Sequence, residues 1–339
     1  MIALEHLLVA TDFSEAADAA LSCGRSLARA FGATLHVIHI SENVFLGPIV
    51  LDSRSVEEAA LNHLLRRLIA DDRRCLHARA VVETSHAPAE AIVAYARKAN
   101  IGLILMGTHG RTGSARLFVG SVAERVVRAA PCPVLTIRHP ERALMLSPRG
   151  ANGVRAIATE PVHLLETEVA MVTLKNILVP TDFGEAADAA LMYAREIAGK
   201  YGATLHVIHV AENIFLKTYG ETYGPLLADM QRDLEEGARK QLDELLIDSD
   251  GSGPPTRRAV LTSASPFSTI VGYAADNDID LIVMGTHGRG GFAHLMMGSV
   301  AERVVRLAPC PVLTVRHPEH EFVRPDTLAT VAHAEPIGI

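Results

Sequence analysis

Two segments of the chain carry glycines at a spacing that suits phosphate binding. In the first, two residues separate Gly107 from Gly110, and nine more precede Gly120-Ser121. A second segment repeats this spacing with four residues of its own, Gly285, Gly288, Gly298 and Ser299. Glycines let backbone N–H groups approach an anion closely, and a helix that begins at the serine would direct its free N–H groups and its dipole toward a phosphate.

The same residues also have a purely structural interpretation. A glycine after a strand can simply make a tight turn, and Ser121-x-x-Glu124 and Ser299-x-x-Glu302 both match the capping box of a helix N-terminus. In each copy, however, about ten residues connect strand and helix, more than the usual two to six, which favours a functional loop. The pattern is neither a P-loop, because GxxxxGK(S/T) is absent, nor a dinucleotide fingerprint.

A second candidate group lies after the first strand of each copy. The tripeptide Thr-Asp-Phe occurs at residues 11–13 and again at 181–183, 170 residues later. Asp12 and Asp182 could bond ribose hydroxyls or hold Mg²⁺ through water. Alternatively they cap the following helix, since a glutamate follows each of them three residues later, as in a capping box.

Charged side chains inside the glycine loops could contact the phosphates. His109 and His287 could donate hydrogen bonds to a phosphate, or they could cap backbone groups of the loop. Arg111, Arg116 and Arg289 could neutralise the charge of a γ-phosphate, or they could be solvated surface residues. Both interpretations stay open at the level of the sequence.

The remaining histidines and the cysteines predict neither a metal site nor a catalytic centre. No HExxH or similar spacing occurs among the 16 histidines, and the four cysteines form no CxxC pair. No Ser-His-Asp or Cys-His arrangement is recognisable, and no lysine lies in either glycine loop, so binding is favoured over catalysis. Four histidines in or at the end of the second strands are interpreted as packed sheet residues: His36, His39, His206 and His209.

Composition excludes several classes of protein. The 339 residues, 49% hydrophobic and 21% charged, suit about two domains with a sizeable core. A net charge of −7, scattered Lys and Arg, and the absence of Trp disfavour nucleic-acid binding and an anionic membrane surface. No secretory signal and no apolar run of membrane-spanning length is recognisable, so a cytoplasmic location is expected.

The chain consists of two copies of one unit. The motifs near the start of each copy recur 170 residues apart and the later ones 178 apart, so the second copy carries eight extra residues, within 212–225 or 250–255. Each copy has the size of an ordinary domain, and a Gly- and Pro-containing linker separates them. We expect four parts: domain 1 at 1–140, a linker at 141–171, domain 2 at 172–318, and a tail at 319–339.

Each copy alternates strands with helices, which predicts an α/β fold. In the first copy the apolar runs that read as strands are Leu4–Ala10, Thr34–Ile40, Ala78–Glu83, Leu103–Met106 and Pro133–Arg138. We therefore expect two doubly wound, Rossmann-like domains, each with a five-stranded parallel sheet flanked by helices. Such sheets bind ligands at the carboxyl ends of strands where strand order reverses. Both candidate groups follow predicted strands, the first and the fourth.

The combined pattern resembles the ATP-binding branch of the universal stress protein family. Gly-x2-Gly-x9-Gly-Ser, together with Thr-Asp-Phe after the first strand, occurs twice, and the resemblance covers nearly all of both halves. In that family the loop holds the phosphates and ribose, and the ends of strands one and two hold adenine and ribose. The resemblance implies an adenine nucleotide alpha hydrolase-like fold and two ATP sites, with Mg²⁺ carried by the nucleotide.

Carried over residue by residue, the resemblance assigns two sets of binding residues. The first nucleotide would contact Ala10, Thr11, Asp12, Ile40, Met106, Gly107, His109, Gly110, Arg111, Gly113, Gly120, Ser121 and Val122. The second would contact Pro180, Thr181, Asp182, Val210, Met284, Gly285, His287, Gly288, Arg289, Gly291, Gly298, Ser299 and Val300. The copies depart from the family in places: Ala10 stands where the family often has Pro, and His86 and Ala264 where it often has Gly. Equal affinity at the two sites is therefore not implied.

The resemblance implies a nucleotide-dependent regulatory protein of the stress response. In the family the fifth strands pair across a dimer, and here we expect that pairing inside the chain, with room for further self-association and for an unidentified protein partner. No catalytic residue is assigned, and hydrolysis of ATP is expected to be weak at most. The alternatives are a nucleotide-independent interaction module and a slow ATPase or adenylating enzyme, although the strand-one Ser-Gly-Gly loop of adenylating synthetases is absent.

Overall fold

The computed structural model describes residues 4–41, 53–68, 70–108, 120–138, 173–216, 224–246, 253–286 and 297–316. The first half contains β1 (His6–Ala10), α1 (Glu15–Phe31), β2 (Thr34–Ser41), α2 (Ser53–Arg67), α3 (Ala70–Cys75), β3 (Arg79–Thr84), α4 (Pro88–Lys98), β4 (Leu103–Gly107), α5 (Ser121–Ala129) and β5 (Val134–Ile137). The second half contains β6 (Asn176–Thr181), α6 (Glu185–Tyr201), β7 (Thr204–Glu212), the 3₁₀ turn η2 (Ile214–Leu216), α7 (Gly224–Leu245), β8 (Thr256–Ser263), α8 (Pro266–Asp276), β9 (Leu281–Gly285), α9 (Ser299–Leu307) and β10 (Val312–Val315).

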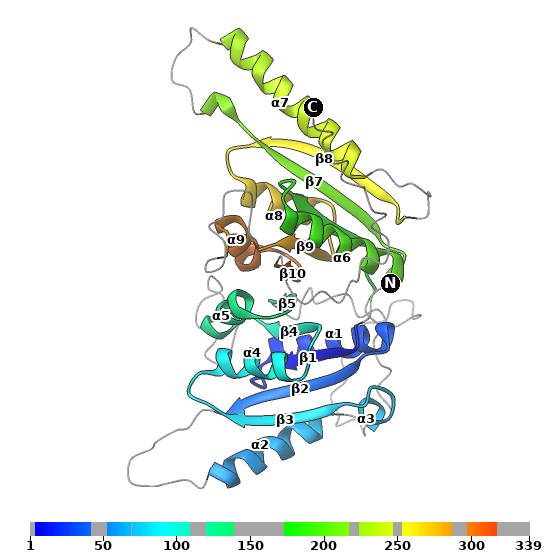
Figure 1. Ribbon diagram of the computed structural model, residues 1–339, viewed down its shortest axis with the longest axis vertical. Coiled ribbons are helices and arrows are strands. Elements are labelled where there is room, and N and C mark those ends of the chain that lie inside the picture. The colour runs from blue at the N-terminus through cyan, green and yellow to red at the C-terminus, as the bar shows by residue number, and fades with distance from the viewer. Residues whose placement is uncertain are drawn as a thin grey trace, which may run out of the picture.

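The ten strands found in the described part of the chain belong to one sheet that runs the length of the molecule (Figure 1). The order is β3-β2-β1-β4-β5-β10-β9-β6-β7-β8, and the strands within each half are parallel. The α/β fold and the five parallel strands per half are therefore confirmed. Strand order reverses between β1 and β4 in the first half and between β6 and β9 in the second, and such reversals are where open sheets bind ligands.

The two halves meet through their fifth strands. β5 and β10 pair in antiparallel fashion, with Thr136 opposite Val312 and Val134 opposite Thr314. All four of these residues are buried. The prediction that the fifth strands cover each other's edges within one chain is confirmed, and the pairing relates the halves by a local twofold arrangement.

Helices cover both faces of the sheet, as parallel strands require. On one face, α1, α2, α6 and α7 contribute buried side chains to a core with the strands, among them Leu27, Leu64 and Tyr193. On the other, α4, α5, α8 and α9 pack against the sheet with side chains such as Ile92 and Val304. The cysteines Cys23, Cys132 and Cys310 are buried in these cores without disulfides.

One pair of equivalent hydrogen bonds locates the eight extra residues of the second half. The hydroxyl of Thr84 donates to Glu57, and the hydroxyl of Thr262 donates to Glu235 at 2.6 Å. Both pairs of equivalent residues are 178 apart, so the offset has already grown from 170 by Glu235. The extra residues therefore lie between β7 and Glu235, which agrees with the first predicted range, 212–225, and excludes the second, 250–255.

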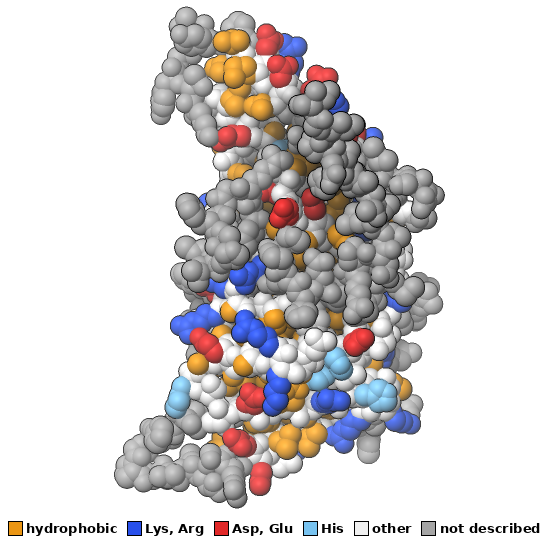
Figure 2. All heavy atoms as spheres, viewed as in Figure 1, with side chains coloured by type: hydrophobic (Ala, Val, Ile, Leu, Met, Phe, Trp, Pro, Cys, Tyr) orange, Lys and Arg blue, Asp and Glu red, His pale blue; other side chains and the backbone are white. Residues whose placement is uncertain are grey.

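The outer surface of α7 carries exposed apolar side chains. Leu226, Met230 and Leu234 follow one another at helical spacing and are 58%, 48% and 49% exposed. Figure 2 shows hydrophobic side chains at the top of the molecule, where α7 lies in Figure 1. Among the described residues, no helix is both long enough and apolar enough to cross a membrane.

Candidate functional site

The two predicted groups of each half come together at the reversal of strand order. In the first half β1 and β4 are neighbours, and Ala10 lies opposite Met106 at their carboxyl ends. Asp12 lies two residues after the last residue of β1, and Gly107 is the last residue of β4. β6 and β9 make the same arrangement in the second half. The sheet therefore places the Thr-Asp-Phe segment and the start of the glycine loop side by side.

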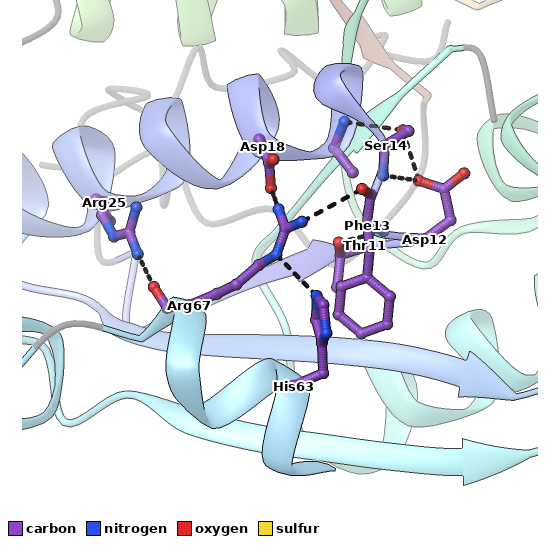
Figure 3. Close-up of polar contacts among 9 residues, drawn as sticks. Thr11, Asp12, Phe13, Ser14, Asp18, Arg25, His63 and Arg67 are labelled. Atoms are coloured by element: carbon purple, nitrogen blue, oxygen red, sulfur yellow. Dashed lines mark hydrogen bonds and ion pairs between the residues drawn. The ribbon is translucent and has the colours of Figure 1, made fainter. Parts of the chain in front are cut away.

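The segment after β1 is a tight turn held by its own side chains (Figure 3). The hydroxyl oxygen of Thr11 accepts a hydrogen bond from the Phe13 N–H at 3.0 Å. The Asp12 carboxylate accepts two from Ser14, from its N–H at 3.0 Å and its hydroxyl at 2.6 Å. Ser14 is the N-cap of α1 and accepts from the N–H of Ala17 at 3.3 Å. The alternative interpretation of Asp12 as the helix cap is wrong, because the cap lies two residues later and Asp12 shapes the turn before it.

The second half builds the same turn without the serine. Thr181 accepts from the Phe183 N–H at 2.9 Å, and the Asp182 carboxylate accepts from the Gly184 N–H at 3.1 Å. Gly184 is the N-cap of α6 and has no side chain to close the helix. The capping interpretation is therefore wrong for Asp182 as well. The feature shared by the two halves is the turn, whose centre is the aspartate.

A strained residue lies inside each turn. The φ angle is +68° at Phe13 and +61° at Phe183, in the left-handed region. Bulky side chains rarely adopt this conformation, which costs on the order of 1–3 kcal/mol and persists only where the surroundings enforce it. Strain of this kind gathers at functional sites. Because both halves contain this strain at the reversal of strand order, the two turns are candidates for part of a ligand-binding site.

A histidine from the neighbouring strand holds each turn in place. Nδ1 of His39, in β2, lies 2.9 Å from the carbonyl oxygen of Thr11, and Nδ1 of His209, in β7, lies 2.8 Å from that of Thr181. A carbonyl oxygen only accepts, so Nδ1 carries the proton in both histidines. The two imidazoles also lie against the strained phenylalanine rings, with centroid distances of 4.4 and 4.6 Å.

Reasoning from the sequence identified these histidines as packed residues of the sheet and missed what they bind. All four predicted sheet histidines do lie in β2 or β7, and His36, His39 and His206 are buried. The position of these histidines in their strands could have predicted the contact. His39 and His209 each lie near the carboxyl end of the strand beside the one that ends in Thr-Asp-Phe.

Packing explains the first glycine of each loop. A Cβ atom on Gly107 would lie 2.8 Å from Cβ of Ala16, and one on Gly285 would lie 2.9 Å from Cβ of Ala186. Side chains do not approach so closely, so only glycine lets the end of the strand touch the first turn of α1 or α6. These glycines let the end of the strand lie directly against the start of the helix in each half.

The glycine and serine that begin α5 and α9 do not form the predicted capping boxes. The N-caps are Gly120 and Gly298, and no side-chain hydrogen bond caps either helix. Ser121 and Ser299 are the first helical residues, and both are exposed. A serine in this position cannot act as the N-cap, so the capping interpretation of these serines is wrong.

The conformation of these two glycines is ordinary. The φ angles of Gly120 and Gly298 are −58° and −60°, so neither needs the left-handed region. Their N–H groups donate to the carbonyl oxygens of Thr108 and Thr286 at 2.6 and 2.7 Å. These bonds tie the start of α5 to the end of β4 and the start of α9 to the end of β9.

The remaining predicted residues divide into two groups. Ala10, Met106, Ile40 and Val122 pack into one apolar cluster at the edge of the first site, and Met284, Val210 and Val300 join the corresponding surface of the second. Pro180 is half-buried at the end of β6.

Outside the described residues lie the middle parts of both loops, with the predicted His109, Gly110, Arg111, Gly113, Arg116, His287, Gly288, Arg289 and Gly291. Among the described residues, no group of three His, Cys, Asp or Glu side chains is arranged to hold a metal ion.

Comparison with known proteins gives one consistent result. A universal stress protein of Methanocaldococcus jannaschii is 32% identical over 148 residues, which cover 43% of this chain and 85% of that protein. A universal stress protein of Thermus aquaticus is 34% identical over 142 residues, which cover 42% of this chain and 98% of that protein. The crystal structure of a universal stress protein from Archaeoglobus fulgidus shares the fold, with a TM-score of 0.59 and 21% identity over 92% of this chain and 98% of that one.

A family model ties these similarities to both halves of the chain. The model described as the Universal stress protein family matches residues 3–138 and again residues 173–316. The two matches together span well over half of the sequence, and each contains one complete set of five parallel strands. The chain therefore belongs to the universal stress protein family and carries two of its domains in tandem.

Proposed function

We propose that each half binds one molecule of ATP where its strand order reverses, and that the chain is a nucleotide-dependent regulatory protein of the stress response. The observation that carries the proposal is the strained turn after β1 and β6. Phe13 and Phe183 both hold a left-handed conformation, with φ of +68° and +61°. A turn that presents backbone and carboxylate groups to a ligand would account for that cost.

The start of the following helix supplies the second support for the proposal. In each half an exposed serine, Ser121 or Ser299, lies in the first turn of a nine-residue helix and makes no capping bond. Free N–H groups and the helix dipole favour an anion at this place. A nucleotide with its base and ribose near the turn and its phosphates at the helix start would use both features.

Binding rather than turnover is the role that these residues support. Asp12 and Asp182 are engaged in the turn that they shape. In each site the histidine nearest the turn directs its Nδ1 to a backbone carbonyl. Neither arrangement pairs a nucleophile with a base, so hydrolysis at these groups would be slow.

Calorimetric titration of the full chain with Mg-ATP tests the proposal. We expect a stoichiometry near two. Ser121→Ala and Ser299→Ala should weaken the binding of Mg-ATP. Because neither serine is an N-cap, the melting temperature without nucleotide should hardly change. Ser265→Ala is the matched control, since Ser265 is the N-cap of α8 and makes no side-chain capping bond. Absence of binding at millimolar Mg-ATP would rule out nucleotide binding and favour a nucleotide-independent interaction module.

A further inference from the structure

Most of the exposed large apolar side chains lie on one helix. Among the residues that the structure describes, five such side chains are exposed, and four of them belong to η2 and α7. Leu226, Met230 and Leu234 follow one another at intervals of four residues, which places them on one side of α7 over about 12 Å of its length. We call these three residues the α7 stripe. A row of exposed apolar side chains is typical of a surface that binds another molecule.

Side-chain hydrogen bonds fix the first half of α7 to the sheet. The N–H of Ile214, in η2, donates to the buried side chain of Gln231 at 3.1 Å, and the Gln231 amide donates to Glu235 at 3.3 Å. Glu235 also accepts from Thr262, in β8. Phe215, the next residue of η2, is 44% exposed and adds a fourth apolar side chain close to α7. The stripe therefore lies on a helix that is already held in place, which lowers the entropic cost of binding a partner.

Part of the stripe lies on an extension of the helix. α7 has 22 residues and α2 has 15. At the offset of 178, Ser53 at the start of α2 corresponds to Gln231, so residues 224–230 of α7 precede that position. Leu226 and Met230 belong to this extension. The first half forms the same five parallel strands with the shorter helix, so the sheet does not require these apolar residues.

Acidic side chains border the stripe. Asp229, Asp233 and Glu236 are exposed and follow one another at helical spacing. The two aspartates come three residues after Leu226 and Met230, respectively, so they lie next to these residues on the helix surface. In Figure 2, acidic side chains adjoin the hydrophobic ones at the top of the molecule.

Most of this negative charge is not compensated on the helix itself. Arg232 forms an ion pair with Asp229, whereas Asp233 and Glu236 form no ion pair with another residue in the described part of the chain. Residues 226–237 contain four acidic residues and one basic residue. The surroundings of the stripe therefore favour a partner that carries positive charge.

This charge distinguishes between the molecules that could cover the stripe. A second copy packed antiparallel on the same stripe would bring its own acidic row beside this one, and like charges repel. An anionic lipid surface would meet the same repulsion. An amphipathic helix with apolar residues on one face and basic residues beside them would cover the stripe and pair with the carboxylates.

We propose that the α7 stripe is a docking surface for an amphipathic helix of a protein partner, and that basic residues beside the apolar face of that helix pair with Asp233 and Glu236. The apolar contact supplies the affinity, and the acidic row selects the partner by its charge. Because the stripe covers only about two helical turns, the complex is a transient one. The proposal does not depend on nucleotide binding, so each can fail without the other.

Fluorescence anisotropy with two labelled synthetic peptides tests the proposal on the full chain. Both peptides are amphipathic helices with the same leucines on one face; the residues beside the leucines are lysines in one and glutamates in the other. The lysine peptide should bind at least about tenfold more tightly, and added salt should reduce the difference.

Variants of the stripe test where the lysine peptide binds. Met230→Ser and Leu234→Ser should each weaken its binding several-fold. Because both side chains are exposed, the melting temperature of the chain should hardly change. Val56→Ser is the matched control and should bind as the wild type does, since Val56 is 39% exposed and is the counterpart of Leu234 in α2.

Charge reversal tests the acidic row. The double variant Asp233→Lys with Glu236→Lys should bind the glutamate peptide more tightly than the lysine peptide. Glu58→Lys with Asp276→Lys makes the same change in net charge at exposed positions of α2 and α8, and it should leave the lysine peptide preferred. This control separates the local charge of α7 from the net charge of −7 of the whole chain.

Four results would overturn the proposal. The first two are equal affinities for the two peptides, and lysine-peptide binding that neither serine variant weakens. The third is self-association of the chain in sedimentation that Met230→Ser abolishes, because a second copy would then cover the stripe. The fourth is binding to phosphatidylglycerol vesicles that Met230→Ser abolishes, because a lipid surface would then be the partner.

Discussion

Thr136 and Thr314 join the two halves by the same hydrogen bond made in opposite directions. The hydroxyl of Thr136 donates to the carbonyl oxygen of Val312, and that of Thr314 donates to the carbonyl oxygen of Val134, both at 3.1 Å. Both threonines are 2% exposed. Because β5 and β10 are short, these bonds form a substantial part of the polar contact at the centre of the sheet.

Replacing both threonines should weaken the contact between the two halves and lower the stability of the chain. Thr136→Val and Thr314→Val keep the shape of the side chain but remove the donor, at a cost of about 1 kcal/mol each. Urea unfolding should show nearly equal losses for the two single variants. Thr136→Ser retains the hydroxyl and should lose less than Thr136→Val. An unchanged unfolding midpoint in the double valine variant would show that the hydroxyl bonds contribute nothing to stability.

The first glycine of each loop should matter for stability whether or not nucleotide is present. The Cβ atom of Gly107→Ala would meet Ala16 at 2.8 Å, which forces strand and helix apart and should cost about 1–3 kcal/mol. Gly199 of α6 is the control, since no heavy atom would lie within 4 Å of its Cβ. Gly199→Ala should be neutral or more stable by up to about 1 kcal/mol. Equal melting temperatures for the two variants would contradict the packing role of Gly107.

The histidines that hold the two turns should be found in one tautomer. His39 and His209 must carry the proton on Nδ1 in order to donate to the carbonyls of Thr11 and Thr181. Nitrogen-15 NMR of the imidazoles at neutral pH reports this directly. His39→Ala should leave the strand-end carbonyl without that donor and destabilise the chain by about 1–3 kcal/mol. Protonation on Nε2 alone in the wild-type chain would exclude these hydrogen bonds.

The core histidine His36 should make the chain sensitive to acid. Burial, followed by the charges of His6 and Arg79, lowers the pKa of His36 from 6.5 to about 4. Between these two values the unfolded chain binds more protons than the folded chain, so stability falls as pH is lowered through this window. The loss should be on the order of 1–3 kcal/mol and should level off below the folded-state pKa.

Urea unfolding across this pH range, with His36→Asn as the comparison, measures the contribution. Asparagine does not titrate, so the variant should lose less stability between neutral pH and the lower limit of the window. His206, the counterpart of His36, also has a pKa that burial lowers, and part of the acid sensitivity should therefore remain. Identical pH profiles for the variant and the wild-type chain would show that His36 does not contribute.

Patterns that extend over many residues predicted the fold correctly. Predictions about single residues failed where the same short sequence is compatible with two local structures. The alternation of strands and helices correctly led to the parallel sheet, and the family resemblance, applied to the two copies of the repeat, led to the pairing of β5 with β10. The capping patterns were misleading because each helix begins one or two residues away from the position that its pattern implies. Ser14 lies two residues after Asp12 and caps α1 instead, and Gly120 precedes Ser121 and takes the cap position of α5.

Two features of the site were missed by reasoning from the sequence. The contact between His39 and Thr11 joins residues 28 positions apart, and only the register of neighbouring strands brings them together. The left-handed Phe13 runs against the preference of bulky side chains, so no propensity would predict it. The sequence also cannot separate a glycine that approaches a ligand from one that approaches a helix, as Gly107 does.

The pairing of β5 with β10 inside one chain has a consequence for how this protein can evolve. In a homodimer built through the same strands, one mutation changes both sites at once, since both subunits are copies of one gene. Here each half is encoded separately, so one site can change while the other keeps its residues. The two copies have already diverged in this way. Ser14 of the first copy corresponds to Gly184 of the second, Ala10 to Pro180, and Arg67 to Leu245. Because one chain carries both domains, selection can change the two candidate sites independently.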